Sequence, residues 1–372
     1  MKYIHVLDEF SLAGGGVRSV VSDVSKKMVS KGMDVYIFTL TVPQDVSDDT
    51  INNWARDNGI HFDILGQGSG SLLKATMRLR SIIKELYRDD ECCLYMHLKK
   101  GVLMGILSTL LSKKVKRVEV YHSGYMRYKL QAFLCRPFIR HYIAVSKDAK
   151  KQLINQFGIK DEKITVAYNG VDLDGIRSKA IDMRTDHDVV RFLTIGRFAY
   201  PKNIELSVEA YAQLVSRVQD VRTEYLIAGD GPDREMIESK ASGTVKFLGL
   251  ISRDSVCSQL ASTDVVVFPS LWEGNSIALL ETIAVGTVLL VTDIPSFREV
   301  LGNKPLSEQE LFRPEPFGAV FHKDSVESCM AAMDYLVRNK SLYQTMKAFV
   351  GALAENYTLE EQCQKYLNVA CL

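Results

Sequence analysis

The sequence predicts an α/β protein of two domains, each with a mostly parallel sheet covered by helices. Three observations carry this prediction. The chain has 372 residues, which is enough for about two domains. Short apolar runs alternate with amphipathic segments in both halves, as in parallel sheets joined by helical crossovers. Between the halves, residues 173–188 are mostly polar, and we expect a linker there.

The first half opens on an apolar strand, a tight glycine turn and a helix with apolar residues near a period of 3.6. We expect this half to form an N-terminal domain over residues 1–180. Its expected strands are 3–7, 34–40, 93–97, 117–121, 141–145 and 164–168, and its expected helices include 17–30 and one that ends at Gly158.

The second half repeats the alternation, and we expect a second domain over residues 181–352. A C-terminal helix, 353–372, is expected to pack back on the first domain. The expected strands of this half are 189–195, 223–228, 244–248, 264–268 and 287–292, and its last helices are 325–336 and 341–371. Two such halves would enclose a cleft, and ligands of these sheets bind outside the carboxyl ends of the strands.

The composition is that of an ordinary globular protein, with 47% hydrophobic and 24% charged residues. No apolar run reaches the roughly 18 residues that a membrane span needs. The first eight residues carry one lysine and too short an apolar core for a signal peptide. The seven cysteines show no metal-ligand spacing, so we expect reduced thiols in a cytoplasmic protein.

The net charge of +1 hides an asymmetry between the halves. Residues 1–185 carry 29 Lys and Arg against 20 Asp and Glu, whereas residues 186–372 carry 17 against 25. Within 97–151 there are 13 basic residues and only two acidic ones. We therefore expect a basic face on the first domain, which would attract an anionic lipid, a nucleic acid or a phosphate-bearing substrate.

Two glutamates separated by seven residues, Glu273 and Glu281, are the most informative feature. The first lies in a loop after an apolar strand, and the second lies inside the helix that opens near Ser276. The backbone amides of Asn275, Ser276 and Ile277 can hold phosphate at the helix N-terminus, and the carboxylates can hold sugar hydroxyls. The spacing favours a nucleotide-sugar ligand, and the alternative is a pair of solvated charges.

Two further candidate loops each follow the first expected strand of one half. Gly15 and Gly16, in the run 14–16, would let the backbone approach a phosphate, or would form a flexible turn. Because the dinucleotide fingerprint is incomplete, NAD is not supported. Gly196 and Arg197, with Lys202 five residues on, would place two cations on a pyrophosphate, unless they are surface charges.

The remaining candidates are weaker. Residues 228–232, Ala-Gly-Asp-Gly-Pro, predict a sharp turn into a helix that shapes the cleft. His122 follows a strand and could bind a sugar hydroxyl or serve as a structural histidine. The spacing assigns no Ser-His-Asp set and gives no strong Asp-x-Asp metal signal, so neither a protein nucleophile, a metal nor another cofactor is expected.

In this order, the motifs resemble glycosyltransferase family 4, also known as glycosyl transferases group 1, which has the two-domain GT-B fold. The resemblance covers nearly the whole chain. It rests on the glycine loop at 14–16, Val145-Ser-Lys147 leading to Tyr168-Asn-Gly-Val-Asp172, Gly196-Arg197 with Lys202-Asn203, Gly229-Asp-Gly-Pro232, and the Glu273/Glu281 pair at the family's spacing.

The resemblance implies that the domain over 1–180 binds the acceptor and that the domain over 181–352 binds the nucleotide-sugar donor. It also implies roles for single residues. Arg197 and Lys202 would bind the donor diphosphate, and Glu281 would bind the ribose hydroxyls. Glu273 would face the transferred sugar, His122 would lie beside it, and the glycine-loop amides would reach the phosphate. The reaction would retain the anomeric configuration without a divalent metal. The loop after Glu273, Gly-Asn-Ser, departs from the Gly-Phe-Pro of many members, which loosens the inference about the sugar.

The resemblance thus implies a retaining, hexosyltransferase-type enzyme that uses a nucleotide-sugar, UDP-linked in preference to GDP-linked. The acceptor would be a glycan or lipid-linked glycan in bacterial-type surface polysaccharide synthesis. Alternatives are a GT-B sugar phosphorylase, a nucleotide-sugar epimerase, or a non-catalytic nucleotide-sugar-binding regulator. Residues 125–140 mix cations with apolar side chains and would touch an anionic membrane or a lipid-diphosphate, or form a packed helix with a solvated basic face. Peripheral contact with the inner membrane face follows from the first option, and no nucleic-acid motif is present.

Overall fold

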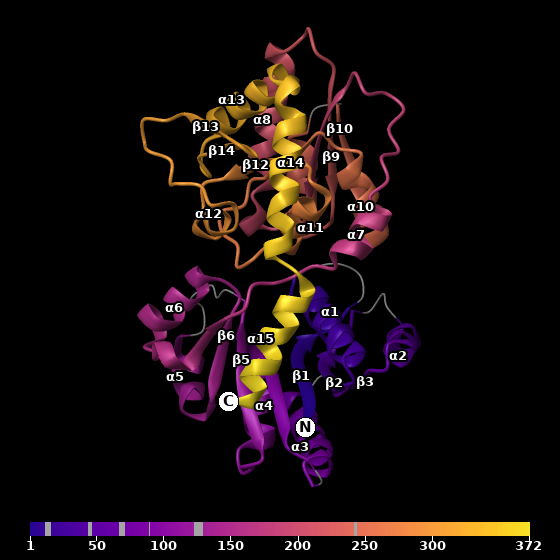
Figure 1. Cartoon of the computed structure of the whole chain (residues 1–372), viewed down its shortest axis with the longest axis vertical. Helices are drawn as coiled ribbons and strands as arrows, with labels where there is room; N and C mark the ends of the chain where they lie inside the picture. Colours follow the sequence, from indigo (N-terminus) through magenta and orange to yellow (C-terminus); the bar gives the residue numbers. More distant parts are fainter. Residues whose placement is uncertain (12–15, 44–46, 67–70, 89, 123–128, 242–243) are drawn as a thin grey trace. The chain divides into compact units, whose positions relative to one another are not determined.

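The computed structural model describes residues 1–11, 16–43, 47–66, 71–88, 90–122, 129–241 and 244–372. The chain forms two compact units (Figure 1). Unit 1 combines Met1–Gly170 with Leu359–Leu372, and unit 2 is the continuous segment Val171–Thr358. Unit 1 is therefore built from two stretches that are far apart in the sequence.

Unit 1 contains a seven-stranded parallel sheet with the order β3-β2-β1-β4-β5-β6-β7. The order reverses between β1 and β4, so the loops at the carboxyl ends of these two strands leave toward opposite sides of the sheet. The strands are β1 (Lys2–Glu9), β2 (Asp34–Thr41), β3 (His61–Ile64), β4 (Cys92–His97), β5 (Val115–Tyr121), β6 (His141–Ala144) and β7 (Ile164–Val166).

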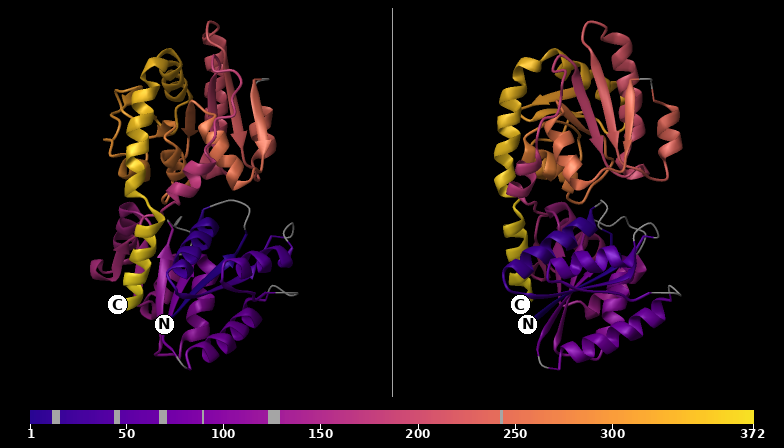
Figure 2. Two further views of the ribbon diagram at one scale, coloured as in Figure 1. Left: turned by 45° about the vertical axis from the view of Figure 1, so that its right-hand side comes forward. Right: turned by 90° about the vertical axis from the view of Figure 1, so that its right-hand side faces the viewer.

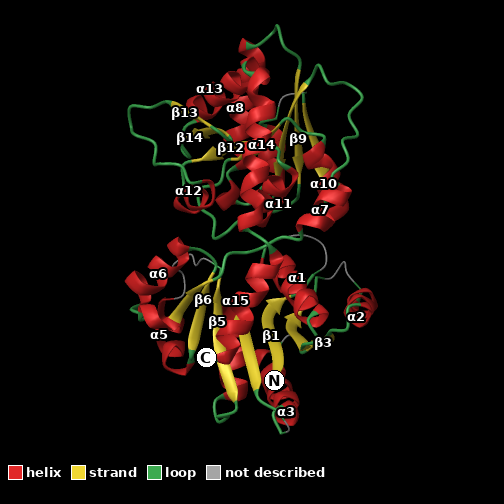
Figure 3. Ribbon diagram, viewed as in Figure 1, coloured by secondary structure: helices red, strands yellow, loops and turns green. Residues whose placement is uncertain are grey.

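Helices cover both faces of this sheet (Figure 2). They are α1 (Val17–Ser30), α2 (Asp48–Asp57), α3 (Leu72–Leu86), α4 (Leu98–Thr109), α5 (Lys129–Cys135), α6 (Lys147–Phe157) and α15 (Leu359–Cys371), with short 3-10 turns η1 (Arg136–Phe138) and η2 (Asp161–Lys163). Helix α15 packs beside α1, and Glu360 forms ion pairs with Lys27 and Lys31 across this contact (Figure 3). The C-terminal helix thus completes the N-terminal sheet.

Unit 2 contains a second seven-stranded sheet with the order β10-β9-β8-β11-β12-β14-β13. All of its pairs are parallel except the hairpin of β13 and β14. The strands are β8 (Val190–Ile195), β9 (Thr223–Ala228), β10 (Val245–Gly249), β11 (Val265–Phe268), β12 (Val288–Thr292), β13 (Phe312–Glu315) and β14 (Gly318–Phe321). Here the order reverses between β8 and β11.

The helices of unit 2 form two groups, α8 with α9 and α13, and α7 with α10, α11 and α14. Strands β8, β11 and β12 between them are almost fully buried. The helices are α7 (Leu173–Lys179), α8 (Ile204–Arg217), α9 (Arg234–Ser239), α10 (Arg253–Ala261), α11 (Ile277–Val285), α12 (Pro295–Leu301), α13 (Val326–Arg338) and α14 (Tyr343–Leu353), with 3-10 turns η3 (Tyr200–Lys202), η4 (Lys340–Leu342) and η5 (Ala354–Asn356).

The predicted fold class, two Rossmann-like α/β domains, is confirmed, but two local predictions are wrong. The expected linker over 173–188 begins with helix α7 instead. The Asp172 carboxylate accepts a hydrogen bond from the Gly175 amide, and Leu173 and Ile176 are buried, so this polar stretch has both a cap and an apolar side. The hairpin of β13 and β14 was not expected.

The single helix expected over 341–371 is instead two helices, α14 and α15, separated by η5. The carbonyl of Tyr357 accepts a hydrogen bond from the Val171 amide, and the Tyr357 hydroxyl donates to the carbonyl of Val300. These contacts hold the chain outside helical geometry. The pattern Thr358-x-x-Glu361 is typical of a helix N-terminus and could have revealed the new start at Leu359.

No helix among the described residues is long and apolar enough to cross a membrane. All seven cysteines are free thiols, and six of them are buried. Burial raises the pKa of the Cys92 thiol to about 11 and that of Cys93 to about 12, so these adjacent thiols are protonated near neutral pH.

Candidate functional site

The loops that carry the predicted site residues of unit 2 follow β8 and β11, which are neighbours in the sheet. The strand order reverses between them, and α/β sheets bind their ligands outside the carboxyl ends of strands at such a point. The two loops are tied together because the Leu271 amide donates a hydrogen bond of 2.9 Å to the carbonyl of Pro201 in η3. This bond positions Lys202 against the loop that contains Glu273.

Lys202 and Glu273 form a direct ion pair. The Lys202 Nζ donates to the Glu273 Oε1 over 2.5 Å, and the side chains are 27% and 13% exposed. The Ser270 hydroxyl donates to the same carboxylate oxygen over 2.9 Å. The Ser270 carbonyl in turn accepts a 2.6 Å hydrogen bond from the Thr292 hydroxyl at the end of β12. Glu273 is therefore held in place from two directions and is largely withdrawn from water.

Arg197 differs from Lys202 because no carboxylate of a described residue pairs with it. Its side chain is exposed, and among the residues that the structure describes its guanidinium makes no hydrogen bond or ion pair. Gly196 precedes it, and the three atoms nearest to a Cβ at that position would belong to the Lys202 side chain, at 3.5 Å or more. The loop after β8 thus offers one unneutralised cation next to open backbone, which suits a phosphate oxygen.

The turn after β9, residues 228–231, contacts the loop after β8 through backbone hydrogen bonds. The Phe198 amide donates to the carbonyl of Asp230, and the Asp233 amide donates to the carbonyl of Phe198. Gly229 has φ 142°, and a Cβ there would lie 1.9 Å from the Gly196 carbonyl oxygen. Only glycine fits at such a distance. This turn therefore shapes the loop that carries Arg197, whereas its predicted role in shaping a cleft stays a prediction.

The second predicted glutamate lies in α11. Helix α11 begins at Ile277, as predicted, and Asn275, Ser276 and Ile277 at its start are buried. The Ser276 side chain makes no capping hydrogen bond. The backbone amides in the first turn of α11 therefore depend on other hydrogen-bond partners. Glu281 is 7% exposed, and the Arg253 Nε donates to its Oε1 over 3.2 Å.

Three residues of this region escaped the sequence reasoning. Arg253 opens α10 after the capping residue Ser252, and arginine is common at such places, so no sequence signal marks it. Tyr200 and Trp272 stack edge to face at 5.4 Å, and each is a close sequence neighbour of Lys202 or Glu273. Tyr200 is 68% exposed. Aromatic residues beside the two predicted loops could have signalled a sugar-contacting rim.

The other predicted residues belong to unit 1. Gly16 has φ 56° at the start of α1, a conformation that favours glycine, and a Cβ there would meet nothing within 4 Å. Gly15 lies outside the described residues. His122 follows β5, and its Nε2 lies 2.9 Å from the Nδ1 of His97. Burial lowers the pKa of His122 to about 4, so its ring is neutral at physiological pH.

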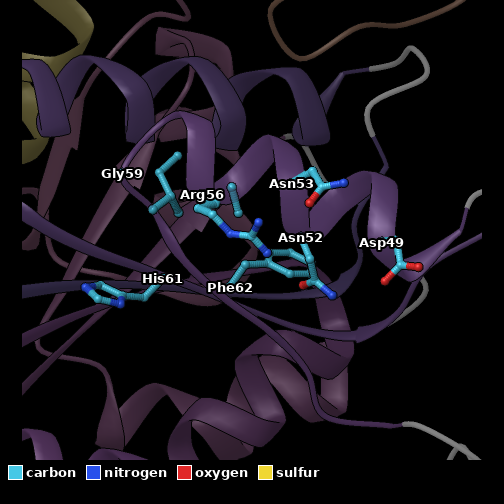
Figure 4. A pocket seen from close by; sticks show the side chains of 9 residues that line it. Asp49, Asn52, Asn53, Arg56, Gly59, His61 and Phe62 are labelled. Carbon is cyan, nitrogen blue, oxygen red and sulfur yellow. The ribbon is translucent and has the colours of Figure 1, made fainter.

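A separate hollow of about 550 Å³ lies at the edge of unit 1 (Figure 4). Residues of α2, the turn after it and β3 line this hollow, among them Asn52, Arg56 and His61. None of the predicted site residues belongs to it. Across the described ranges, no three His, Cys, Asp or Glu side chains gather closely enough to hold a metal ion.

Both halves of the chain match known families. Residues 14–174 match Glycosyltransferase Family 4, and residues 181–350 match Glycosyl transferases group 1. An uncharacterised glycosyltransferase of Methanocaldococcus jannaschii is 28% identical over 218 residues, 54% of this chain and 55% of that protein. The match thus spans about half the length of that relative. The phosphatidyl-myo-inositol mannosyltransferase of Mycolicibacterium smegmatis is 26% identical over 300 residues, 78% of this chain and 75% of that protein.

Solved structures share the fold. Anabaena HepE in complex with UDP-glucose superposes with a TM-score of 0.77 at 16% identity, over 100% of both chains. The fold likeness and the two family matches, which together span residues 14–174 and 181–350, agree with the motif order of the sequence. The chain therefore belongs to the GT-B glycosyltransferases, with a Glycosyltransferase Family 4 region in its first half and a Glycosyl transferases group 1 region in its second.

Proposed function

We propose that this glycosyltransferase is a retaining enzyme that moves a sugar from a nucleotide-sugar, UDP-linked in preference to GDP-linked, to a glycan or lipid-linked glycan. The observation that carries the proposal is the Lys202–Glu273 ion pair in the same pair of loops as Arg197, whose guanidinium has no partner among the described residues, at the point where the strand order of unit 2 reverses. The mannosyltransferase relative, named for a phosphatidyl-inositol acceptor, supports the lipid-linked class.

Charge explains how these residues would act on the donor. A departing nucleoside diphosphate gains negative charge in the transition state, and Arg197 and Lys202 would stabilise it. The Lys202 ammonium donates a hydrogen bond to Glu273 in this structure. A bound diphosphate would draw the ammonium toward itself, and the Ser270 hydroxyl would still donate to Glu273. Two cationic side chains supply the charge that a divalent metal supplies in other transferases, so the proposed reaction needs no metal.

Retention follows from attack on the face that the diphosphate leaves. The bond between the anomeric carbon and the phosphate oxygen breaks, and the acceptor oxygen bonds to the same carbon on the same side. The acceptor proton passes to the departing phosphate oxygen, so no protein nucleophile or base is needed. Glu273 would then orient the sugar and stabilise its positive charge, and orientation of this kind is a large part of catalysis.

The proposal is tested by the thermal stability of the protein with UDP, GDP, ADP and their common sugar conjugates, each with and without EDTA. Binding to the folded state raises the melting temperature by mass action. We expect a shift with one nucleotide that survives EDTA. A shift with none of them would contradict the donor site. Phosphate-dependent sugar release without nucleotide would instead indicate a phosphorylase, interconversion of the free nucleotide-sugar an epimerase, and donor binding without hydrolysis or transfer a regulator.

Glu281 is expected to contribute mainly to donor affinity. Glu281→Ala should weaken donor binding about tenfold to a hundredfold, because each hydrogen bond from a ribose hydroxyl to a carboxylate contributes about 1.5–3 kcal/mol. Titration calorimetry with the nucleotide found in the stability screen measures this. Glu224 is the matched control, since it is also a mostly buried glutamate paired with an arginine, Arg191, over 2.5 Å. Equal loss of affinity in Glu224→Ala would show that the effect is not local to the site.

A membrane-facing surface on unit 1 is the second part of the proposal. In α5 and η1, Leu130, Phe133, Leu134 and Phe138 are 72%, 67%, 59% and 40% exposed. The alternative of an apolar side packed inward fits Cys135 and Ile139, which are buried. Arg136 and Arg140 are exposed beside these side chains. Apolar side chains flanked by arginines suit an anionic bilayer. Residues 125–128 of the predicted stretch lie outside the described residues.

Flotation with anionic vesicles at low salt tests this surface. We expect the wild type to float and the double variant Phe133→Ser with Leu134→Ser to lose more than tenfold in binding, because each buried apolar side chain contributes about 1.5–3 kcal/mol. The control is Ile181→Ser with Met183→Ser, two equally exposed apolar residues of unit 2. Absence of flotation for the wild type, or equal loss in both double variants, would contradict the membrane proposal.

A further inference from the structure

Three histidines of unit 1 form a continuous hydrogen-bonded row that ends at His122. The Nδ1 of His5 lies 3.0 Å from the Nε2 of His97, and the Nδ1 of His97 lies 2.9 Å from the Nε2 of His122. His5 and His97 are fully buried, whereas His122 is partly exposed. The row therefore runs from the inside of the sheet to the carboxyl end of β5, where the sequence placed a site residue.

The sheet register produces this row. His5 of β1 pairs with Tyr95 of β4, so His97 lies two residues further along on the same face. His97 pairs with Val120 of β5, so His122 again lies two residues further along on that face. Each step moves the next imidazole toward the carboxyl ends of the strands. The three rings come from parts of the chain that are 92 and 25 residues apart.

Packing from α15 fixes the inner end of the row. The His5 ring stacks on Tyr95 at 5.0 Å, and the Tyr366 ring lies 6.4 Å from it. The Tyr95 hydroxyl donates to the carbonyl of Tyr366 over 2.7 Å. Adjacent imidazoles of the row stack at 5.2 Å. These contacts leave the rings little freedom to turn, so the nitrogens keep their order.

All three rings are neutral at physiological pH. Burial lowers the pKa of His5 to about 3 and that of His122 to about 4, and it lowers the pKa of His97 well below its usual value. A neutral imidazole has one N–H donor and one acceptor nitrogen. Both hydrogen bonds of the row can therefore exist in only two arrangements, with every ring donating outward toward His122 or every ring donating inward toward His5.

The inner end of the row decides between these arrangements. Within the described part of the chain, the Nε2 of His5 has no hydrogen-bond partner. If the rings donated inward, this nitrogen would carry a buried N–H without an acceptor, which is rare in folded proteins. If the rings donate outward, the Nε2 of His5 carries no hydrogen, and only its acceptor lone pair is left without a partner among the described residues. The outward arrangement leaves His122 with its Nε2 as acceptor and its proton on Nδ1.

We propose that His5 and His97 are positioning residues that fix His122 as the Nδ1–H tautomer, so that it donates a hydrogen bond to an oxygen of the transferred sugar or its phosphate. This rests on the proposed transferase function for the identity of the ligand, but the tautomer itself does not. The row holds no metal, because its nitrogens face one another rather than a common centre.

The tautomer can be measured directly by nitrogen NMR on protein labelled with 15N-histidine. The chain has seven histidines, so single substitutions are enough to assign the signals. We expect the Nδ1 of His122 to have the shift of a protonated nitrogen and its Nε2 that of an unprotonated one. A protonated Nε2 in the wild type would overturn the proposal whether or not the enzyme binds nucleotides.

Two variants at His97 separate positioning from mere packing. In His97→Asn the amide takes the place of Nδ1 and can still donate to His122, so tautomer and kinetics should be close to wild type. In His97→Asp the carboxylate can only accept, so the proton of His122 should move to Nε2. We expect kcat to fall about tenfold in this variant with little change in the donor KM, as for one lost transition-state hydrogen bond.

A second route avoids a buried carboxylate. His5→Phe keeps the stacking on Tyr95 but removes the donor to His97, so both tautomers of His122 should become populated. His141→Gln is the matched control, because His141 lies in the same sheet and bonds to Thr165 outside the row. Unchanged tautomers in His5→Phe, or unchanged kcat in a folded His97→Asp, would overturn the positioning role. A missing nucleotide shift would instead refute the proposed function.

Discussion

Lys202→Ala should lower kcat about 10²–10³-fold, the effect of removing one preorganised charge that acts on a departing oxyanion. The loss has two physical parts. The diphosphate loses the ammonium that would stabilise its growing charge, and Glu273 loses the cation that now lies 2.5 Å from it. Glu273 would then stand as an uncompensated, mostly buried carboxylate next to an anionic leaving group. Initial rates at saturating donor measure the change.

Two further variants test this explanation. Lys202→Arg keeps the charge and should recover part of the activity. Lys240→Ala is the control, since Lys240 is also an ion-paired lysine of unit 2, bonded to Glu205 and Glu209 on the surface. In Lys202→Ala with Glu273→Gln, removal of the stranded carboxylate should restore some donor affinity. A wild-type kcat in Lys202→Ala would show that the leaving group is held elsewhere.

Acid should destabilise unit 1 through the three histidines of the row. Their pKa values are lowered in the folded protein, to about 3 for His5 and about 4 for His122, and lie near 6.5 in the unfolded chain. Between these values the unfolded state binds more protons than the folded state. The stability that these groups contribute is therefore fully present above pH 6.5 and decreases as the pH falls, by about 1.4 kcal/mol per pH unit for each histidine.

Urea unfolding between pH 5 and pH 7.5 measures this slope. Glu119 acts in the opposite direction, because burial raises its pKa to about 7 and the unfolded carboxyl titrates lower. Glu119 is present in both the wild type and His5→Phe, so its contribution cancels when their pH slopes are subtracted. We expect the variant to depend less steeply on pH, by about one proton. Identical slopes would mean that His5 is not buried in its neutral form.

The sequence predicted those features that depend on local pattern. Apolar runs located most strands, and the glutamate spacing located the loop after β11 and the start of α11. The missed features depend on register and on contacts between distant segments. His5 and His97 stand in apolar strands and looked like strand residues, because only the pairing of β1, β4 and β5 aligns them. The Arg253–Glu281 pair joins two helices in the same way.

The paired loops of unit 2 show the same limit. The sequence placed Lys202 and Glu273 in one site but assigned them to different parts of the donor. Their direct bond arises because β8 and β11 are neighbours and the Leu271 amide ties one loop to the other. The residue spacing within either loop does not reveal that β8 and β11 are neighbours in the sheet. The break before α15 is a related case. Thr358 gives a local sequence signal for the start of the new helix, but nothing in the sequence predicts the contact with Val171 that holds the chain there.

The membership of α15 in unit 1 determines the order in which the protein can be completed during translation. A ribosome releases Met1–Gly170 first, but the face of β1 and β4 on which Tyr366 packs stays open until Leu359–Leu372 emerges. Unit 2, a continuous segment, can finish folding before that moment. The nascent N-terminal sheet must therefore wait with this face uncovered until α15 has been made, long after its own strands have left the ribosome.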